Sequence, residues 1–204
     1  MKKKLLALAV LMICLSLISL GTLAYFNAED TAHNVITTSN VEIDLQEWKE
    51  LPSAEKPEGV PFEDLKGVMP GETVSKIVTV KNTGGAAYVR VWVSTAISEP
   101  GDPITSPTIK NLPLTMEVEG KTVELIEINY NTEKWTQGED GYWYYNKAVK
   151  TGETTEPLFT TVEFHKLMGN AYQNSVTRVD VSAQAVQSAN NGGSAMDAAG
   201  WPET

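Results

Sequence analysis

VDVSAQAV, at residues 179–186, is the stretch that decides the fold of this 204-residue chain. Apolar and polar side chains alternate along it: Val179, Val181, Ala183 and Ala185 against Asp180, Ser182 and Gln184. Successive side chains of an extended strand point to opposite faces, whereas those of a helix repeat about every 3.6 residues. The period of two therefore predicts a strand with one buried face and one solvated face.

Several other stretches are also predicted to be strands. Alternation continues in LFTTVEF at 158–164 and in AYVRVWVS at 87–94. The remaining candidates are ETVSKIVTV at 72–80, GYWYYNKAV at 141–149 and the segment from Val35 to Leu45. LTMEVEGKTVELIEI at 114–128 predicts two strands joined at Glu119-Gly120-Lys121, because glycine accepts the positive φ that a tight hairpin needs.

Turn clusters separate these strands, and no stretch has helical spacing over more than two turns. MPGET, NTGG, SEPGDP and ANNGG are rich in glycine, proline and asparagine, which favour turns. Seven to nine short strands punctuated in this way predict an all-β fold, an antiparallel jelly roll or β-sandwich. The least regular parts are Lys49–Pro61 and the end of the chain, so we expect one domain over 25–190 and a flexible tail over 191–204.

The first 24 residues have the composition of a secretory signal peptide. Lys2, Lys3 and Lys4 precede an apolar run from Leu5 to Leu20, which falls short of the ~20 apolar residues that span a bilayer. Thr22 and Ala24 are the small residues expected just before a cut, and acidic and polar sequence follows. We expect cleavage between Ala24 and Tyr25 and export from the cell. A retained membrane anchor is the alternative, and only the uncleaved signal would contact the membrane.

The composition limits both the partners and the means of stabilisation. The whole chain has a net charge of −10, and loss of the three signal lysines leaves 13 basic against 26 acidic residues, or −13. Such a surface repels phosphate backbones, so nucleic acid is not an expected partner. Cys14 is the only cysteine and lies in the signal, so the exported protein has to rely on a packed core rather than on disulfides.

A search for catalytic and metal-binding patterns finds none. The two histidines, His33 and His165, are far apart, and the sequence has no His-Glu-x-x-His, Gly-x-Ser-x-Gly or phosphate-loop motif. The acidic pairs Glu63-Asp64 and Glu139-Asp140 lack the alternating spacing of a calcium loop. We therefore expect no catalytic residue, no metal site and no cofactor, and the protein is not predicted to be an enzyme.

The aromatic run GYWYY is the candidate for a binding surface. Tyr142 and Tyr144 lie on one face of the predicted strand and Trp143 and Tyr145 on the other, so one pair is a candidate exposed aromatic surface. Exposed aromatic rings can stack on sugars or anchor a protein partner. Cross-strand pairing of these rings within the sheet is the alternative, and it is the favoured interpretation.

The order of motifs along the chain resembles that of the TasA/camelysin family of exported biofilm-matrix proteins of Gram-positive bacteria. The similarity rests on GTLAYFNAED at 21–30, on TSNVEIDL at 38–45 and on MPGETVSKIVTVKNTGGAAYVRVWV at 69–93. RVDVSAQAVQSAN at 178–190 is similar to the closing strand of such proteins. The resemblance covers residues 1 to about 95 well, the closing strand moderately, and the middle of the chain poorly.

The resemblance implies a secreted jelly-roll subunit that a SipW-like signal peptidase releases. In TasA-like fibres the new amino-terminal segment of one subunit adds as a strand to the next, and the same role here falls on Tyr25, Phe26, Val35 and Ile36 as candidate donor residues. The expected partner is another copy or a related matrix subunit, and head-to-tail addition grows filaments. The intervening NAEDTAHN is polar, so a frayed leader at 25–34 remains the alternative.

Two other functions remain open at this point. Camelysin relatives are assigned to a metallopeptidase family, although no catalytic residue can be matched in this chain. A monomeric cell-surface adhesin or carbohydrate-binding module is the second, and it would depend on Trp143 or Tyr144.

Overall fold

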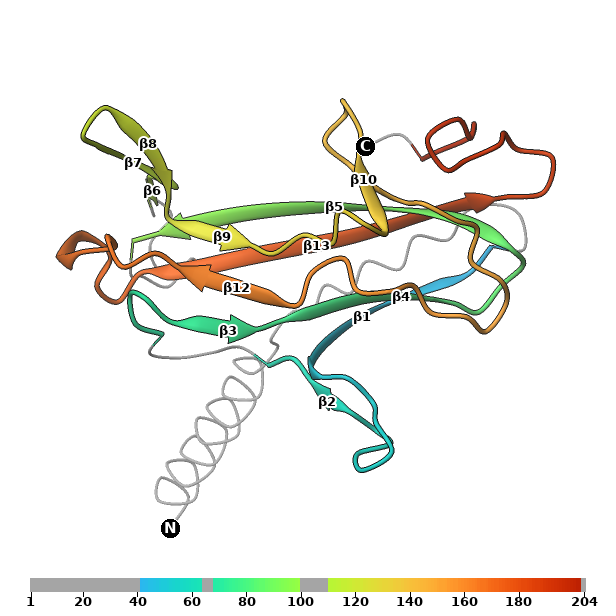
Figure 1. Ribbon diagram of the computed structural model, residues 1–204, viewed down its shortest axis with the longest axis horizontal. Coiled ribbons are helices and arrows are strands. Elements are labelled where there is room, and N and C mark those ends of the chain that lie inside the picture. Colours follow the sequence, from blue (N-terminus) through green and yellow to red (C-terminus); the bar gives the residue numbers. More distant parts are fainter. Residues whose placement is uncertain (1–40, 64–67, 100–109, 203–204) are drawn as a thin grey trace, which may run out of the picture. The chain divides into compact units, whose positions relative to one another are not determined.

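The protein is described by a computed structural model that covers residues 41–63, 68–99 and 110–202. These residues all belong to one compact unit. The described part is mostly β-structure in antiparallel sheets and has no α-helix, which confirms the predicted all-β class (Figure 1). The expected signal peptide, the Ala24–Tyr25 cut and the donor residues Tyr25, Phe26, Val35 and Ile36 lie outside the described residues.

The first group of strands is built around a long antiparallel pair. β5 (Ala87–Ser98) and β13 (Val176–Gln187) pair over all twelve of their residues, with Val91 opposite Ala183. β11 (Trp143–Tyr145) lies on the other side of β5, and β10 (Trp135–Gln137) follows it. A short strand, β6 (Asn111–Leu112), pairs with the end of β5. The predicted strand at 179–186 is therefore the centre of β13.

The second group of strands begins with β1. β1 (Ile43–Glu50) pairs with β4 (Ile77–Asn82) and, at its end, with β2 (Val60–Pro61). β3 (Thr73–Ser75) and β9 (Ile126–Ile128) flank β12 (Thr161–Phe164). The predicted strand at 72–80 is thus two strands, interrupted at Lys76, and the expected loop after Lys49 begins after Glu50. The segment 152–160 links the β2–β1–β4 sheet to the β3–β12–β9 sheet, because it leads into β12 and its backbone is hydrogen-bonded to residues 78, 80 and 82 of β4.

A tight hairpin stands apart from both groups, where the sequence predicts it. β7 (Thr115–Val118) pairs with β8 (Lys121–Glu124), and Val118 lies opposite Lys121. The two connecting residues, Glu119 and Gly120, have φ angles of 52° and 75°. A turn with positive φ at both central residues matches the right-handed twist of the flanking strands. Glycine is favoured there because it accepts a positive φ.

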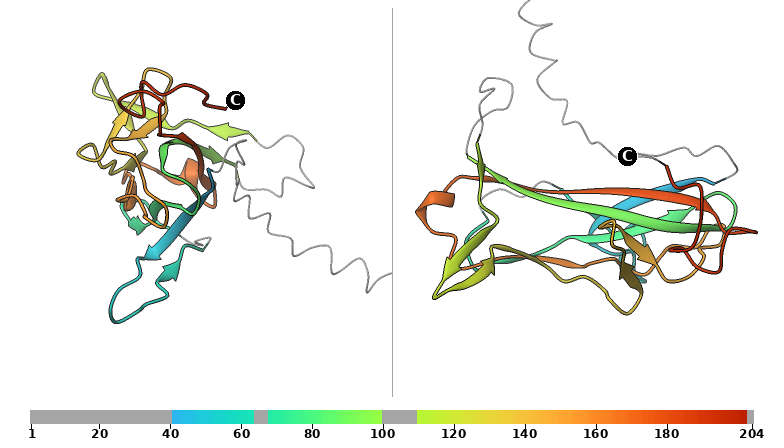
Figure 2. Two further views of the ribbon diagram at one scale, coloured as in Figure 1. Left: turned by 90° about the vertical axis from the view of Figure 1, so that its right-hand side faces the viewer. Right: turned by 90° about the horizontal axis from the view of Figure 1, so that it is seen from above.

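The two groups of strands share one hydrophobic core. It takes Val78 and Val80 from β4, Val89 and Val91 from β5, and small residues from β13. Each of these four valines is fully buried, which stabilises the fold by about 1.5–3 kcal/mol for a side chain of this kind. Figure 2 shows β13 running beside β5, and β1 of the other group approaches β13 as well.

Candidate functional site

The aromatic run at 142–145 is buried on both of its faces. The exposed fractions of Tyr142, Trp143, Tyr144 and Tyr145 are 6%, 8%, 7% and 1%. Trp143 and Tyr145 belong to the main core, where Tyr145 lies opposite Trp135 with ring centroids 4.9 Å apart. The candidate exposed aromatic surface is therefore wrong, and the rings pack within the protein, as in the favoured interpretation.

The outer pair, Tyr142 and Tyr144, is covered by the end of the chain. Both side chains belong to a second hydrophobic cluster that also contains Tyr88, Val186, Ala195 and Ala198. Trp201 packs against this cluster, and its ring meets that of Tyr144 edge-on at a centroid distance of 5.7 Å. Residues 191–202, which we call the C-terminal strap, are thus packed on the sheet, so the expectation of a flexible tail is wrong for them.

Arg90 is the centre of this second site. It lies in the middle of β5, and its side chain is only 9% exposed. Its Nε donates to Gln184 Oε1 at 2.8 Å, its Nη1 to the Tyr144 hydroxyl at 3.1 Å, and its Nη2 to the carbonyl oxygen of Pro202 at 3.1 Å. Asp140 Oδ2 lies 3.4 Å from Nη1 and forms the ion pair.

Two aromatic rings lie beside the guanidinium group of Arg90. The Tyr142 ring centroid lies 3.9 Å from its central carbon, and the Trp201 ring centroid lies 4.7 Å away. A cation near the face of an aromatic ring is attracted by the ring quadrupole, more strongly where water is excluded. Arg90 therefore links three strands and the strap. We call this group of residues the Arg90 cluster; it consists of Arg90, Asp140, Tyr142, Tyr144, Gln184 and Trp201.

The chemistry of the Arg90 cluster is that of a structural anchor. Each of the three guanidinium nitrogens donates to a protein acceptor, and Asp140 offsets the charge of the group. Burial raises the pKa of Tyr144 above its ordinary value, and the hydrogen bond from its hydroxyl to Asp140 acts in the same direction. Arg90 acts in the opposite direction on this pKa. The hydroxyl of Tyr144 stays protonated over the physiological range and bridges Arg90 and Asp140.

The sequence predictions missed most of this cluster. Arg90 occupies the nominally polar face of an alternating strand, and the tail sequence GWPET gives no sign of packing. One signal was present, because arginine in the middle of an apolar strand is rarely buried unless it is paired. The aromatic side chain that is exposed nearby is Trp92, at 41%, and its ring lies 5.2 Å from that of Tyr142.

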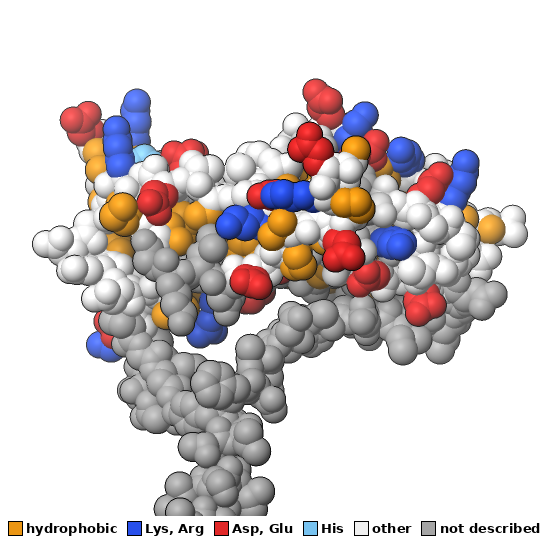
Figure 3. Space-filling model, turned by 90° about the horizontal axis from the view of Figure 1, so that it is seen from below, with side chains coloured by type: hydrophobic (Ala, Val, Ile, Leu, Met, Phe, Trp, Pro, Cys, Tyr) orange, Lys and Arg blue, Asp and Glu red, His pale blue; other side chains and the backbone are white. Residues whose placement is uncertain are grey.

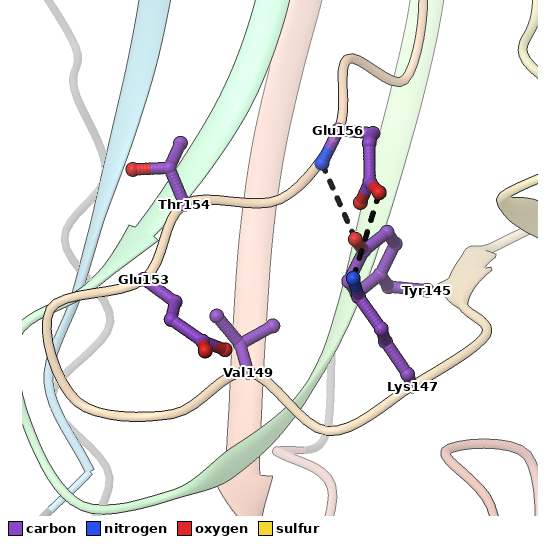
Figure 4. A pocket seen from close by; sticks show the side chains of 6 residues that line it. All are labelled: Tyr145, Lys147, Val149, Glu153, Thr154 and Glu156. Carbon is purple, nitrogen blue, oxygen red and sulfur yellow. Dashed lines mark hydrogen bonds and ion pairs between the residues drawn. The ribbon is translucent and has the colours of Figure 1, made fainter.

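A shallow hollow of about 190 Å³ lies on the other side of β11 (Figure 4). It is lined by Tyr145, Lys147, Val149, Glu153, Thr154 and Glu156. Lys147 and Glu156 form an ion pair at 3.5 Å, and the backbone N–H of Glu156 donates to the Tyr145 hydroxyl at 3.3 Å. The hollow is open and polar, and it is small beside the ~300–1,000 Å³ of typical ligand pockets.

The described residues offer no arrangement for metal chemistry. Among them, no three side chains of the His, Cys, Asp or Glu types come together to hold an ion. His165 Nδ1 accepts the backbone N–H of Leu167 at 3.1 Å, while His33 lies outside the described residues. Asp140 of the acidic pair at 139–140 is bound to Arg90 and Tyr144. Within the same described ranges, no helix has the length and hydropathy to cross a membrane.

The second feature of functional interest is the outer edge of β13. β13 ends its sheet, and among the described strands only β5 pairs with it. Val179 and Val181 on its core-facing side are only partly buried, whereas Ala183 and Ala185 further along are 1% and 2% exposed. The core is therefore covered less completely beside the first half of β13 than beside the second half.

The face seen in Figure 3 mixes charges of both signs. Acidic and basic side chains alternate over the described part of this face, with hydrophobic side chains between them. The described part of this face consequently has no extended region of one sign.

No protein-family model, curated protein or solved structure matches the chain.

Proposed function

We propose that this protein is a secreted structural component, a subunit or accessory protein, of extracellular biofilm-matrix fibres. In this proposal it is a jelly-roll protein of the TasA/camelysin type that a SipW-like peptidase releases by cutting between Ala24 and Tyr25. Copies then assemble by strand donation with one another or with a related subunit. The function is binding and not catalysis, and it needs no cofactor.

The edge of β13 between Val176 and Ser182, where β5 is the only described strand that pairs with it, is the observation that carries this proposal. An edge strand presents a row of backbone N–H and C=O groups that can pair with another chain. β13 has twelve residues, whereas strands in globular proteins usually have about five or six, so its first half alone offers an edge of ordinary strand length. An added strand would gain backbone hydrogen bonds and would also cover the partly buried Val179 and Val181.

The proposed donor is the segment that cleavage would free. Tyr25, Phe26, Val35 and Ile36 form two apolar pairs, and one member of each pair would fill a pocket along the core-facing side of β13, because successive side chains of a strand point to opposite faces. Before cleavage the signal would hold this segment at the membrane, so subunits would not polymerise inside the cell. Head-to-tail donation of this kind does not close on itself, so it extends into a filament.

Electron microscopy of the mature protein, residues 25–204, tests the proposal against a version that lacks residues 25–34. We expect filaments from the first protein and monomers from the second. Filaments from both would rule out the donor role of residues 25–34, and filaments from neither would contradict assembly itself.

A pair of valine variants adds a test of the edge. Val179→Lys places a charge at the partly covered end of the core, and natural proteins use such inward-pointing charges to block edge pairing. Val123→Lys, at a partly buried position of the β7–β8 hairpin, is the matched control. Loss of filaments in the first variant alone supports addition at β13, whereas equal filament formation by both variants contradicts it.

A further inference from the structure

The C-terminal strap begins at the only Asn-Gly pair in the sequence, Asn191-Gly192. In such a pair the backbone nitrogen of the second residue can attack the side-chain amide carbon of the asparagine. Glycine favours this reaction because it has no Cβ to obstruct the approach and because its backbone adopts many conformations. The preceding residue, Asn190, is followed by Asn191 instead of glycine and provides a comparison within the same loop.

The side chain of Asn191 ties the strap to the end of β13. Its Nδ2 donates to the carbonyl oxygens of Gln187 at 2.9 Å and Ala199 at 3.0 Å. Its Oδ1 accepts the backbone N–H of Ala199 at 2.8 Å. The amide is thus used as a donor and as an acceptor at once, which only a side-chain amide can do at this position.

An acid at position 191 cannot make the same contacts. An ionised carboxylate is an acceptor only, so the carbonyl oxygens of Gln187 and Ala199 would lose their donor and would face a negative charge. Conversion to isoaspartate would in addition move the backbone, because the main chain would pass through the side-chain carbon. Either product removes the two hydrogen bonds that the side chain of Asn191 donates.

Another feature of the strap, at Trp201, favours opening. The indole N–H of Trp201 is buried and has no hydrogen-bond partner in the described structure. A buried donor without an acceptor makes docking less favourable, because the same group would bind water when the strap opens. Opening also frees the amide of Asn191 from its three hydrogen bonds, which lets Gly192 attack it.

From these contacts we infer that Asn191 is a site of spontaneous deamidation, and that the reaction releases the C-terminal strap irreversibly. The nitrogen of Gly192 bonds to Cγ of Asn191, the bond from Cγ to the amide nitrogen breaks, and ammonia leaves with the proton of Gly192. Water then opens the cyclic imide to aspartate or isoaspartate. Each molecule whose strap opens and reacts cannot close again, and the Tyr88–Tyr144 face beneath the strap becomes accessible.

The test uses protein recovered from the medium of cells that express the full chain. It is incubated at mildly alkaline pH, and peptide mapping by mass spectrometry follows the amide-to-acid mass change and isoaspartate at Asn191 and Asn190. A synthetic peptide of residues 187–195 runs in parallel as the unfolded reference. Trp201→Ala opens the strap without altering Asn191, and Gly193→Ala is the control because a Cβ there meets no atom within 4 Å.

We expect conversion at Asn191 and not at Asn190, with Trp201→Ala at least about tenfold faster than Gly193→Ala, since the rate follows the open population. Asn191→Asp should let subtilisin cut the strap about tenfold faster than in the unmodified protein. Retention of the Asn191 amide in both the folded protein and Trp201→Ala, while the peptide converts, would overturn the inference. So would a strap in Asn191→Asp that resists subtilisin as well as the original.

Discussion

Replacing Arg90 by methionine is expected to destabilise the protein more than any other change of a single charged residue described above. Methionine keeps much of the aliphatic volume but donates no hydrogen bond. The change leaves Gln184 Oε1 and the carbonyl oxygen of Pro202 without their donors, and Asp140 without its ion pair. Gln184 is only 7% exposed, so the sheet and the strap cannot admit water to its Oε1 atom without opening.

The magnitude follows from the contacts of Arg90. A buried polar group that loses its partner costs about 1–3 kcal/mol, and breaking a buried ion pair from one side costs about 3–5 kcal/mol. Asp140 is 43% exposed and can be solvated, so we expect a loss near the lower end, about 3–4 kcal/mol. In a domain of this size that corresponds to a fall in Tm of about 10 °C.

Urea unfolding followed by near-ultraviolet circular dichroism measures the loss. Lys147→Met is the matched control, because Lys147 also pairs with a carboxylate, that of Glu156, and lies 5.7 Å from a tyrosine ring, yet its side chain is 64% exposed. We expect that control to change the free energy of unfolding by less than about 1 kcal/mol. A loss for Arg90→Met no larger than that of the control would refute the anchoring role of Arg90.

Three further predictions concern other parts of the chain. Gly120→Val should lower the free energy of unfolding by about 1–2 kcal/mol in urea denaturation, because φ is 75° there and no atom obstructs the new side chain; an unchanged midpoint would contradict the turn geometry. Glu47→Gln should cost about 2–3 kcal/mol and Lys76→Met less than about 1 kcal/mol, because Lys76 is 6% exposed and needs its partner at 2.8 Å, whereas Glu47 is 33% exposed and can be solvated alone; equal losses or the reverse order in thermal melts would contradict this reasoning. Because burial raises the pKa of Tyr144, the unfolded chain loses this proton first, so the contribution of Tyr144 to stability should be constant below about pH 10 and fall above it; Tyr144→Phe should show a shallower fall in alkaline unfolding curves, and an identical slope would count against a buried phenol.

The strand pattern was readable from the sequence because the core imposes it locally. Val89 and Val91 alternate with residues of the outer face, and both are fully buried. The turn at Glu119-Gly120 was readable for a related reason, since few residues accept its positive φ angles. Such signals depend only on neighbours in the chain, so they can be recognised without knowing which strand pairs with which.

The outer face of the same sheet was not readable, because what covers it lies about a hundred residues away. Alternation placed Arg90 and Tyr144 on the outer side of their strands, and the usual inference is that this side meets solvent. The strap covers it instead, through Trp201 and the carbonyl oxygen of Pro202. Nothing local to GWPET or to GYWYY links the two stretches, so the site emerges only from the three-dimensional arrangement.

Short strands and an interruption within a strand were the other features that could not be predicted from the sequence. Trp135 is 1% exposed and central to the core, yet β10 has three residues, too few to show a period. Lys76 breaks the predicted strand at 72–80 because its backbone N–H donates to the carbonyl oxygen of Thr160 while its side chain turns to Glu47. A run of β-branched residues on either side of it hides this change.

Hydrogen–deuterium exchange of β13, compared between the monomeric and assembled protein, tests the proposed strand addition most directly. If a donated strand pairs with the open edge, the backbone amides between Val176 and Ser182 that face away from β5 should become protected when filaments form. Filaments in which these amides exchange as fast as in the monomer would show that the copies associate through another surface.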